Sequence, residues 1–260
     1  MTNKQSIKVI KVGGAVIEDA EKRSSFLKAF AGVEGLKILV HGGGRTASEI
    51  GSRLGIQPNM VEGRRVTDDQ TIDVVTMVYG GLVNKQLVAS LQSHAINAIG
   101  LSGADGNLIK SAKRPITNGI DYGWVGDPEQ VNHELIANLL DAQIVPVVAP
   151  LTHDGAGHLL NTNADTIASI LAVAMSKNYQ VDLIATFELE GVYLDINDPD
   201  SLLTNISQIQ FDQLKDEGKI HSGMIPKLQN AFNALHDGVN TVRICKFDQI
   251  NTSHGSIIQI

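Results

Sequence analysis

Six short apolar runs alternate along this chain with segments of helical periodicity, and this alternation restricts the fold more than any other feature. The runs have the length and residue types of buried strands, and they lie at residues 7–12, 36–41, 96–103, 143–149, 181–187 and 240–247. Strands that alternate with helices favour a mainly parallel sheet covered by helices on both faces. The sequence therefore predicts an α/β fold with three layers, an αβα sandwich.

Several shorter signals add detail to this fold. Interruptions rich in glycine and aspartate, typical of added β-hairpins, lie at residues 105–107, 118–123 and 153–158, and a hairpin is also expected over 56–66. Residues 67–70 have the form of a capping box that opens a helix, and Asn163 can cap the helix after it. No fixed-period repeat and no linker rich in proline or serine is visible. We therefore expect one continuous unit.

Composition excludes several classes of protein. Apolar residues make up 43% of the chain and the net charge is −7, which favours a globular protein that does not bind nucleic acid by neutralising phosphates. Cys245 is the only cysteine, so no intrachain disulfide and no cysteine-rich zinc site is expected. Lys8 and Lys11 interrupt the apolar stretch that a signal peptide needs, and the run at 144–151 is too short to span a bilayer. We expect a cytoplasmic protein with no membrane partner.

Two glycine-rich loops follow strands. They read "KVGGAV" and "HGGGRT", after the runs at 7–12 and 36–41. Glycines at the carboxyl end of a parallel strand let backbone N–H groups approach an anion, and the helix that follows adds its positive end. Tight strand-to-helix turns explain such glycines equally well. A P-loop and a dinucleotide-binding fingerprint are both missing from the chain.

Two lysines favour the anion-binding interpretation. Lys11 ends an otherwise apolar strand, so its ammonium group should emerge at the first glycine loop and needs a counter-anion. Lys227 lies in the first turn of an expected helix, where Pro226 is well placed. A cation at a helix N-terminus opposes the helix dipole unless a strongly anionic group binds there.

Seven segments, taken together, resemble the amino-acid kinase superfamily. They are "KVGG", "HGGGRTASEI", "GRRVTDDQ", "GGLVNKQLV", "GLSGADGNL", "NTNADTIA" and "SGMIPKLQNA". Within the superfamily the chain is most similar to the members that phosphorylate N-acylated glutamate, in arginine and ornithine biosynthesis. The resemblance runs from about Ile7 to the closing "HGSIIQI", and it implies MgATP as the phosphoryl donor.

The resemblance also implies roles for the residues around the transferred phosphoryl group. The lysines that match Lys11 and Lys227 stabilise that group in the family, and the aspartate that matches Asp165 holds the two lysines in position. Gly13 and Gly14 match residues that donate N–H groups to the phosphoryl oxygens. The nucleophile is a carboxylate that is already ionised at neutral pH, so no general base is needed.

The same comparison implies a substrate site and two lobes. Gly43 and Gly44 match the backbone that meets the substrate, and Arg65 and Asn161 match anchors of its α-carboxylate. We expect residues 1–175 to form the acylglutamate-binding lobe, which also holds the phosphoryl site, and residues 176–260 to form the nucleotide-binding lobe.

The expected nucleotide lobe departs from the family pattern. The loop "TFELEGVY" at 186–193 carries Phe187 and Glu188 where relatives carry threonine and aspartate. Glu188 and Gly191 are the nucleotide-binding candidates in this loop. Among residues outside these motifs, His41 is expected to pack at a strand end, and Asn84 with Lys85 is interpreted as an exposed helical pair.

Three alternatives to phosphorylation of N-acetyl-L-glutamate stay open. The acyl group could be succinyl, the acceptor could be another acid such as glutamate itself or carbamate, or a degenerate nucleotide lobe could leave a non-catalytic amino-acid-binding protein. The first strand begins near residue 7, which leaves no room for the N-terminal helix that links arginine-inhibited relatives into hexamers. We expect a homodimer that is insensitive to arginine.

Overall fold

An eight-stranded sheet forms the centre of the protein. The computed structural model describes residues 4–61, 63–220 and 224–260. The strand order is β14-β16-β15-β11-β1-β2-β8-β5, and every neighbouring pair is parallel except β15 with β16. The strands are β1 (Ser6–Val12), β2 (Leu36–His41), β5 (Ala98–Leu101), β8 (Val145–Val148), β11 (Gln180–Phe187), β14 (Asn205–Ser207), β15 (Thr241–Lys246) and β16 (Ser256–Gln259). All six predicted strands lie in this mainly parallel sheet.

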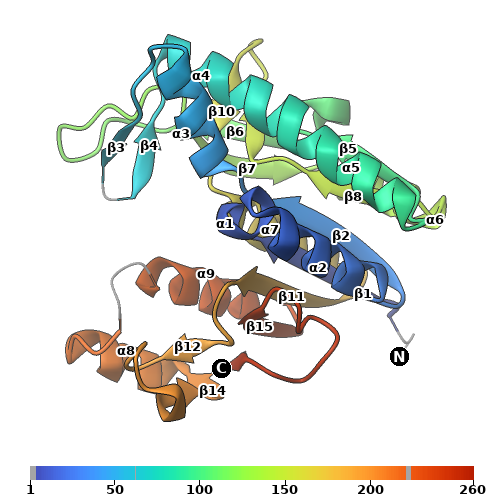
Figure 1. Cartoon of the computed structure of the whole chain (residues 1–260), viewed down its shortest axis with the longest axis vertical. Helices are drawn as coiled ribbons and strands as arrows, with labels where there is room; N and C mark the ends of the chain where they lie inside the picture. The colour runs from blue at the N-terminus through green and yellow to red at the C-terminus, as the bar shows by residue number, and fades with distance from the viewer. Residues whose placement is uncertain (1–3, 62, 221–223) are drawn as a thin grey trace.

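Helices cover both faces of the sheet, as the alternation predicts (Figure 1). Side chains of β1 show the division, since Ile7 and Val9 belong to one core cluster and Ile10 and Val12 to the other. The first cluster includes side chains of α6 (His133–Asp141), α7 (Ala164–Ser176), α8 (Gln208–Asp216) and α9 (Ile225–His236). The second includes side chains of α2 (Ala20–Ala31), α3 (Gly44–Arg53), α4 (Asp69–Val75) and α5 (Asn84–Ser93). The three-layer sandwich is therefore confirmed.

Smaller sheets carry the added hairpins. A four-stranded sheet of order β10-β9-β6-β7 lies beside the main one, and two further pairs are β3 with β4 and β12 with β13. These strands are β3 (Asn59–Val61), β4 (Arg64–Val66), β6 (Ile109–Lys113), β7 (Gly126–Val131), β9 (Leu151–His153), β10 (Leu159–Asn161), β12 (Val192–Tyr193) and β13 (Leu202–Leu203).

Three of the four predicted hairpins form. The hairpin expected over 56–66 is β3–β4, residues 118–123 lie in the β6–β7 connection, and residues 154–158 join β9 to β10. The prediction for 105–107 is wrong. That segment is a short 3₁₀ stretch leading into β6, interrupted at Gly106, which adopts φ 58°. It does not form a hairpin because the preceding strand, β5, pairs with β8 in the main sheet, whereas β6 pairs with β7 and β9.

A long helical segment spans residues 69–93. It joins α4 through a π-helical stretch, Thr76–Val83, to α5. Its cap is Asp68, whose carboxylate accepts from Thr71 N at 2.8 Å, so the predicted capping box is one residue out of register. Within the described residues this is the one helix long and apolar enough to cross a membrane by length and composition. Of its most apolar 18-residue stretch, 44% is buried inside the protein.

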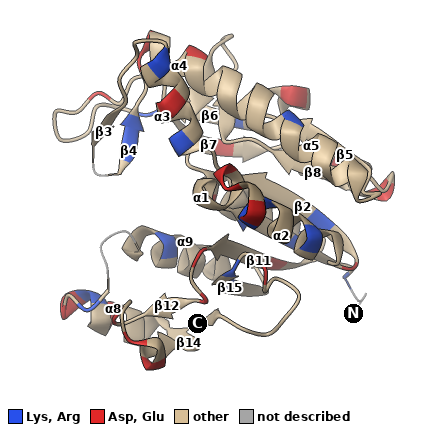
Figure 2. Ribbon diagram, viewed as in Figure 1, with Lys and Arg blue, Asp and Glu red and all other residues tan. Residues whose placement is uncertain are grey.

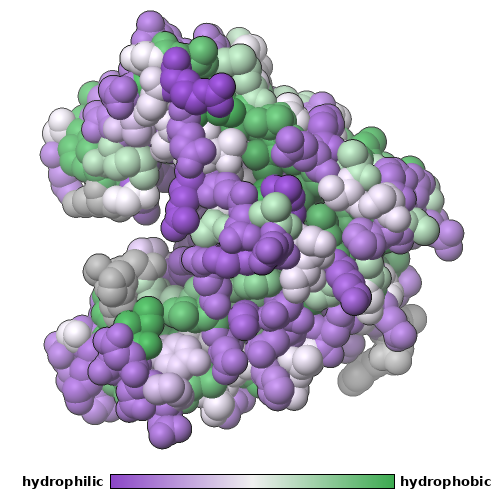
Figure 3. All heavy atoms as spheres, viewed as in Figure 1, coloured by the Kyte–Doolittle hydropathy of each residue, from purple (hydrophilic) through white to green (hydrophobic). Residues whose placement is uncertain are grey.

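The carboxyl ends of β1 and β2 lie side by side and lead into α1 (Gly14–Glu18) and α3. Figure 3 shows the molecule hollowed on this side, between the part that carries the β3–β4 hairpin and the part that carries α8 and α9. The predicted lobe boundary at residues 175 and 176 falls between α7 and β11, yet β1 pairs with β11 along seven residues. One continuous sheet therefore runs through both expected lobes.

Candidate active site

An ion pair between Lys11 and Asp165 stands at the carboxyl end of β1. Lys11 Nζ lies 2.8 Å from Asp165 Oδ1, and Lys11 is only 6% exposed. Lys227, in the first turn of α9, lines the same cavity as this pair. The fold thus brings together the three residues that the sequence analysis singled out for catalysis, from three distant segments of the chain.

The charges of this cluster depend on one another. Burial raises the pKa of the Asp165 carboxyl, but the charges of Lys11 and then Lys227 outweigh it and hold the pKa below its ordinary value. Burial is also the main reason that the pKa of Lys227 is lowered, with Asp165 opposing this effect and Lys11 adding to it. Two ammonium groups around one carboxylate leave one positive charge uncompensated, which suits an anionic ligand.

Local structure places each member of the cluster. Asn163 caps α7, as predicted, and its side chain accepts from Asp165 N at 2.7 Å, so Asp165 lies in the first turn where the helix dipole favours a carboxylate. Pro226 lies in the first turn of α9, also as predicted, and the next residue, Lys227, lines the cavity of the ion pair. Two further residues of the "SGMIPKLQNA" motif, Ser222 and Gly223, lie outside the described residues.

The two glycine loops meet beside this cluster and gather their backbone nitrogens. A Cβ on Gly14 would lie 3.3 Å from Gly43 N and 3.4 Å from Gly44 N, and one on Gly42 would lie 3.0 Å from Gly14 N. Gly14 and Gly44 each begin a helix, so their N–H groups have no acceptor within their own helices. Gly13 caps the first of these helices. The arrangement is an anion-binding nest of converging N–H groups.

Side chains that the sequence analysis did not single out support this nest. The Glu18 carboxylate accepts from Thr46 N at 2.8 Å and from Thr46 Oγ1 at 3.2 Å, which ties the end of α1 to the first turn of α3. The ring of Tyr79 packs on Gly43, since a Cβ there would lie 3.1 Å from Tyr79 Cδ1. No local pattern signals either contact, because each joins segments about thirty residues apart.

Arg65 borders the nest, and Asn161 is connected to the Arg65 backbone through Thr67, whose hydroxyl donates to Arg65 O at 3.1 Å. Arg65 Nη2 donates to Gly44 O and to Ser48 Oγ, both at 2.8 Å, so its guanidinium group is fixed beside the start of α3. Asn161 Nδ2 donates to Thr67 Oγ1 at 3.0 Å, which links β10 to the residue after β4. Figure 2 shows basic residues on β4 and on α9, the elements on either side of the hollow.

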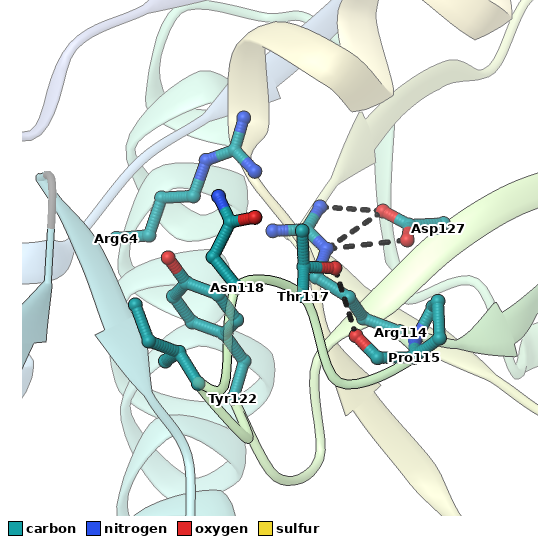
Figure 4. A pocket seen from close by; sticks show the side chains of 8 residues that line it. Arg64, Arg114, Pro115, Thr117, Asn118, Tyr122 and Asp127 are labelled. Carbon is teal, nitrogen blue, oxygen red and sulfur yellow. Dashed lines mark hydrogen bonds and ion pairs between the residues drawn. The ribbon is translucent and has the colours of Figure 1, made fainter.

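The neighbouring Arg64 faces a different space. Successive residues of a strand point to opposite sides, and Arg64 lines a separate cavity of about 280 Å³ together with Asn118 and Tyr122 of the β6–β7 connection (Figure 4). In the same cavity Arg114 Nε donates to Asp127 Oδ1 at 3.1 Å. The β3–β4 hairpin therefore stands between this cavity and the contacts of Arg65.

The two nucleotide-binding candidates lie in the β11–β12 connection. The Glu188 carboxylate pairs with the ammonium group of Lys22 from α2. A Cβ on Gly191 would lie 2.5 Å from Ser256 Oγ and 2.8 Å from Leu202 Cδ1, so close packing by itself requires a glycine there. Neither residue contacts the Lys11–Asp165 ion pair, and their roles toward a nucleotide stay predictions.

One prediction about the surroundings of the site, the exposed pair Asn84 and Lys85, is wrong for Asn84 only, since Lys85 is exposed as expected. Asn84 is 1% exposed rather than solvated, and its side chain lies against His41, which is fully buried at the end of β2 as expected. The sequence does carry a signal for this burial. Asn84 precedes the buried Leu87 and Leu91 by three and seven residues, which puts all three on one face of the helix.

Comparisons with known proteins agree with this geometry. Residues 6–246 match the amino acid kinase family. The acetylglutamate kinase of Cytophaga hutchinsonii is 54% identical over 95% of this chain and 93% of its own length, and that of Parabacteroides distasonis is 50% identical over 97% and 98%. The solved structure of smu.665 from Streptococcus mutans superposes with a TM-score of 0.78 at 25% identity, covering 97% of this chain and 98% of that one.

The fold and the site thus define a phosphotransferase of the α/β class, whose cationic and N–H groups converge where an anionic group can bind. More particularly, the match over nearly the whole chain shows that it belongs to the amino acid kinase family.

Proposed function

We propose that this protein transfers the γ-phosphoryl group of ATP to the γ-carboxylate of N-acetyl-L-glutamate. The observation that carries this proposal is the Lys11–Asp165–Lys227 cluster beside the nest of glycine N–H groups. The relatives named above, both acetylglutamate kinases, support the choice of substrate. The products are ADP and an acyl phosphate, and the reaction belongs to arginine biosynthesis.

Alignment and charge neutralisation suffice for this reaction. A γ-carboxylate oxygen forms a bond to the γ-phosphorus while the bond from that phosphorus to the bridging oxygen of ADP breaks, and no proton has to move. Lys11 and Lys227 neutralise the negative charge of the phosphoryl group in flight, and Asp165 holds the lysines in place. Gly13 and Gly14 supply N–H donors to the phosphoryl oxygens.

The acceptor site uses the other side of the nest. In the proposal, the N–H groups of Gly43 and Gly44 bind the γ-carboxylate, and Arg65 and Asn161 bind the α-carboxylate. Arg65 is already fixed by Gly44 O and Ser48 Oγ, so it loses little side-chain freedom on binding. Residues 1–175 form the acylglutamate-binding lobe in this proposal.

In the same proposal, residues 176–260 form the nucleotide-binding lobe, and the loop that carries Glu188 and Gly191 borders the bound nucleotide. Within the described residues no group of three or more histidine, cysteine, aspartate or glutamate side chains could hold a metal ion, and Asp165 is engaged by Lys11. The site therefore suits a Mg²⁺ ion that arrives bound to ATP and is held by phosphate oxygens and water rather than by a cluster of protein side chains. Such an ion neutralises charge between the β- and γ-phosphates.

The proposal includes a homodimer formed along the segment 69–93. Met77 and Leu82 on this segment are 54% and 41% exposed, and Ile99 on the edge strand β5 is 37% exposed. Figure 3 shows apolar side chains along this helical segment. A two-fold axis there would bury the same patch of both copies. A molar mass from light scattering that corresponds to a monomer or a hexamer would contradict the dimer. The cytoplasmic location of the protein also stays a prediction.

The direct test is ATP-dependent acyl phosphate formation, trapped with hydroxylamine as a hydroxamate. N-acetyl-, N-succinyl- and unblocked L-glutamate are compared, with the Lys11→Ala variant as the matched control. We expect turnover on the acetyl substrate and a loss of about 100-fold or more in the variant. A much higher kcat/KM for the succinyl or the unblocked compound would overturn the substrate assignment. No turnover on any of them would indicate the non-catalytic alternative.

A further inference from the structure

A buried chain of hydrogen bonds lies directly beneath the "HGGG" loop. His41 Nε2 lies 3.1 Å from Asn84 Nδ2, and the same Nδ2 donates to Val147 O at 2.9 Å. Lys85 Nζ donates to Asn84 Oδ1 at 3.2 Å, which is consistent only with this orientation of the amide. His41 is fully buried and Asn84 is 1% exposed.

This network defines the tautomer of His41. The amide N–H₂ of Asn84 donates one hydrogen to Val147 O and the other to His41 Nε2, so Nε2 must be unprotonated. The proton is therefore on Nδ1, which donates to Gly42 O at 2.8 Å. Burial lowers the pKa of His41 to about 4, so the imidazole stays neutral at the pH of the cell.

The bond to Gly42 O fixes a peptide that faces the site. In a trans peptide the C=O and N–H groups point in opposite directions. Because Gly42 O is held toward the buried imidazole, Gly43 N–H points away from it, to the side where Gly14 lies. A peptide between two glycines has no side chain to hold its orientation and can rotate readily. A rotated peptide would present an oxygen, not an N–H group, to an anion.

We propose that His41 and Asn84 are positioning residues that hold the Gly42–Gly43 peptide with its N–H group directed at the reacting anion. This inference deepens the proposed function and rests on it. Neither side chain touches the substrate. Asn84 holds the imidazole tautomer, the imidazole holds Gly42 O, and the peptide carries the effect to Gly43 N–H.

Strand β5 provides the room that the network needs. A Cβ on Gly100 would lie 1.8 Å from Asn84 Oδ1 and 2.7 Å from Lys85 Nζ, and Lys85 Nζ donates to Gly100 O at 2.9 Å. A larger residue at 100 would displace the amide of Asn84. Gly100 in "INAIGLSG" thus supports the same network from a strand that does not reach the nest.

Two matched substitutions at one position test the proposal. Asparagine places its amide nitrogen near the position of histidine Nδ1, whereas glutamine places it near Nε2, so only His41→Asn can still donate to Gly42 O. We expect His41→Gln to lower kcat about 100-fold with little change in the KM for MgATP, because one N–H donor of the nest is no longer held in place. His41→Asn should recover most of this loss, to within about fivefold of the original kcat.

A spectroscopic readout separates positioning from stability. The ¹⁵N NMR spectrum of the His41 imidazole, recorded without substrates, should show a protonated Nδ1 and an unprotonated Nε2. Gly100→Ala should lower kcat as His41→Gln does, which keeps the test valid if His41→Gln does not fold. Equal kcat losses in the two His41 variants, or an Nε2–H tautomer, would overturn the inference and leave the proposed function standing. Absence of turnover in the original protein would overturn both.

Discussion

Replacing Asp165 by asparagine tests the electrostatic reasoning most directly. The substitution keeps the shape of the side chain and an oxygen acceptor for Lys11, and it leaves Asp165 N, which donates to Asn163, unchanged. Only the negative charge is lost. The site then holds the ammonium groups of Lys11 and Lys227 with no anion between them.

The structure gives the size of the effect. At the 2.8 Å separation of Lys11 Nζ and Asp165 Oδ1, and with an effective dielectric constant of about 20, the Coulomb attraction is on the order of 6 kcal/mol. The retained hydrogen bond and entry of water offset part of it. We expect kcat to fall about 100- to 1,000-fold, which corresponds to about 3–4 kcal/mol in the activation free energy.

The assay follows ADP release at saturating acceptor and MgATP between pH 7 and pH 9. The pKa of Lys227 is already lowered by burial and by Lys11, and only Asp165 raises it. In Asp165→Asn that pKa falls further, so the lysine loses its proton as the pH rises, and the activity of the variant should decline over a range in which the original enzyme changes little. Activity within about threefold of the original at every pH would refute this reasoning.

Two further predictions concern the acceptor site and the buried histidine. Arg65→Ala should raise the KM for the acylated glutamate about 10- to 100-fold, the equivalent of one charge-assisted contact. The adjacent Arg64→Ala alters a separate cavity and should leave this KM nearly unchanged. Steady-state kinetics of both variants test the assignment, and equal effects on KM would contradict it. His41 has a folded-state pKa near 4 against an ordinary 6.5, so its contribution to stability is complete above pH 6.5 and is lost as the pH falls toward 4, about 1.4 kcal/mol per pH unit. Urea unfolding between pH 7 and pH 4 should show this slope in the original protein and a shallower one in His41→Asn.

Much of this fold could be predicted from the sequence, because its signals are local. All six predicted strands lie in the main sheet, and the side chains of β1 divide between the two core clusters with a period of two. Asn163 caps its helix as expected. Each of these signals depends on residues within a few positions of one another, so periodicity and capping chemistry are enough to detect it.

Predictions were less accurate where two local interpretations compete. Residues 105–107 contain the same glycine and aspartate that a hairpin needs, but they form a short 3₁₀ stretch. The cap of α4 is Asp68 rather than Thr67, since both residues can accept from the first turn and the hydroxyl of Thr67 instead donates to Arg65 O. Composition cannot distinguish such neighbours, because the choice depends on partners that the fold supplies, such as Asn161 Nδ2, which donates to Thr67 Oγ1 from β10.

The sequence by itself determined the alternation of strands and helices, the two glycine loops and the residues that could bind a phosphoryl group. Only the tertiary structure decided how they meet: that Lys11, Asp165 and Lys227 line one cavity, that Glu188 pairs with Lys22, and that Asn84 is buried against His41. The physical reason is that local conformation follows from neighbouring residues, whereas an active site is assembled by contacts between segments far apart in the chain, and their geometry exists only once the core has packed.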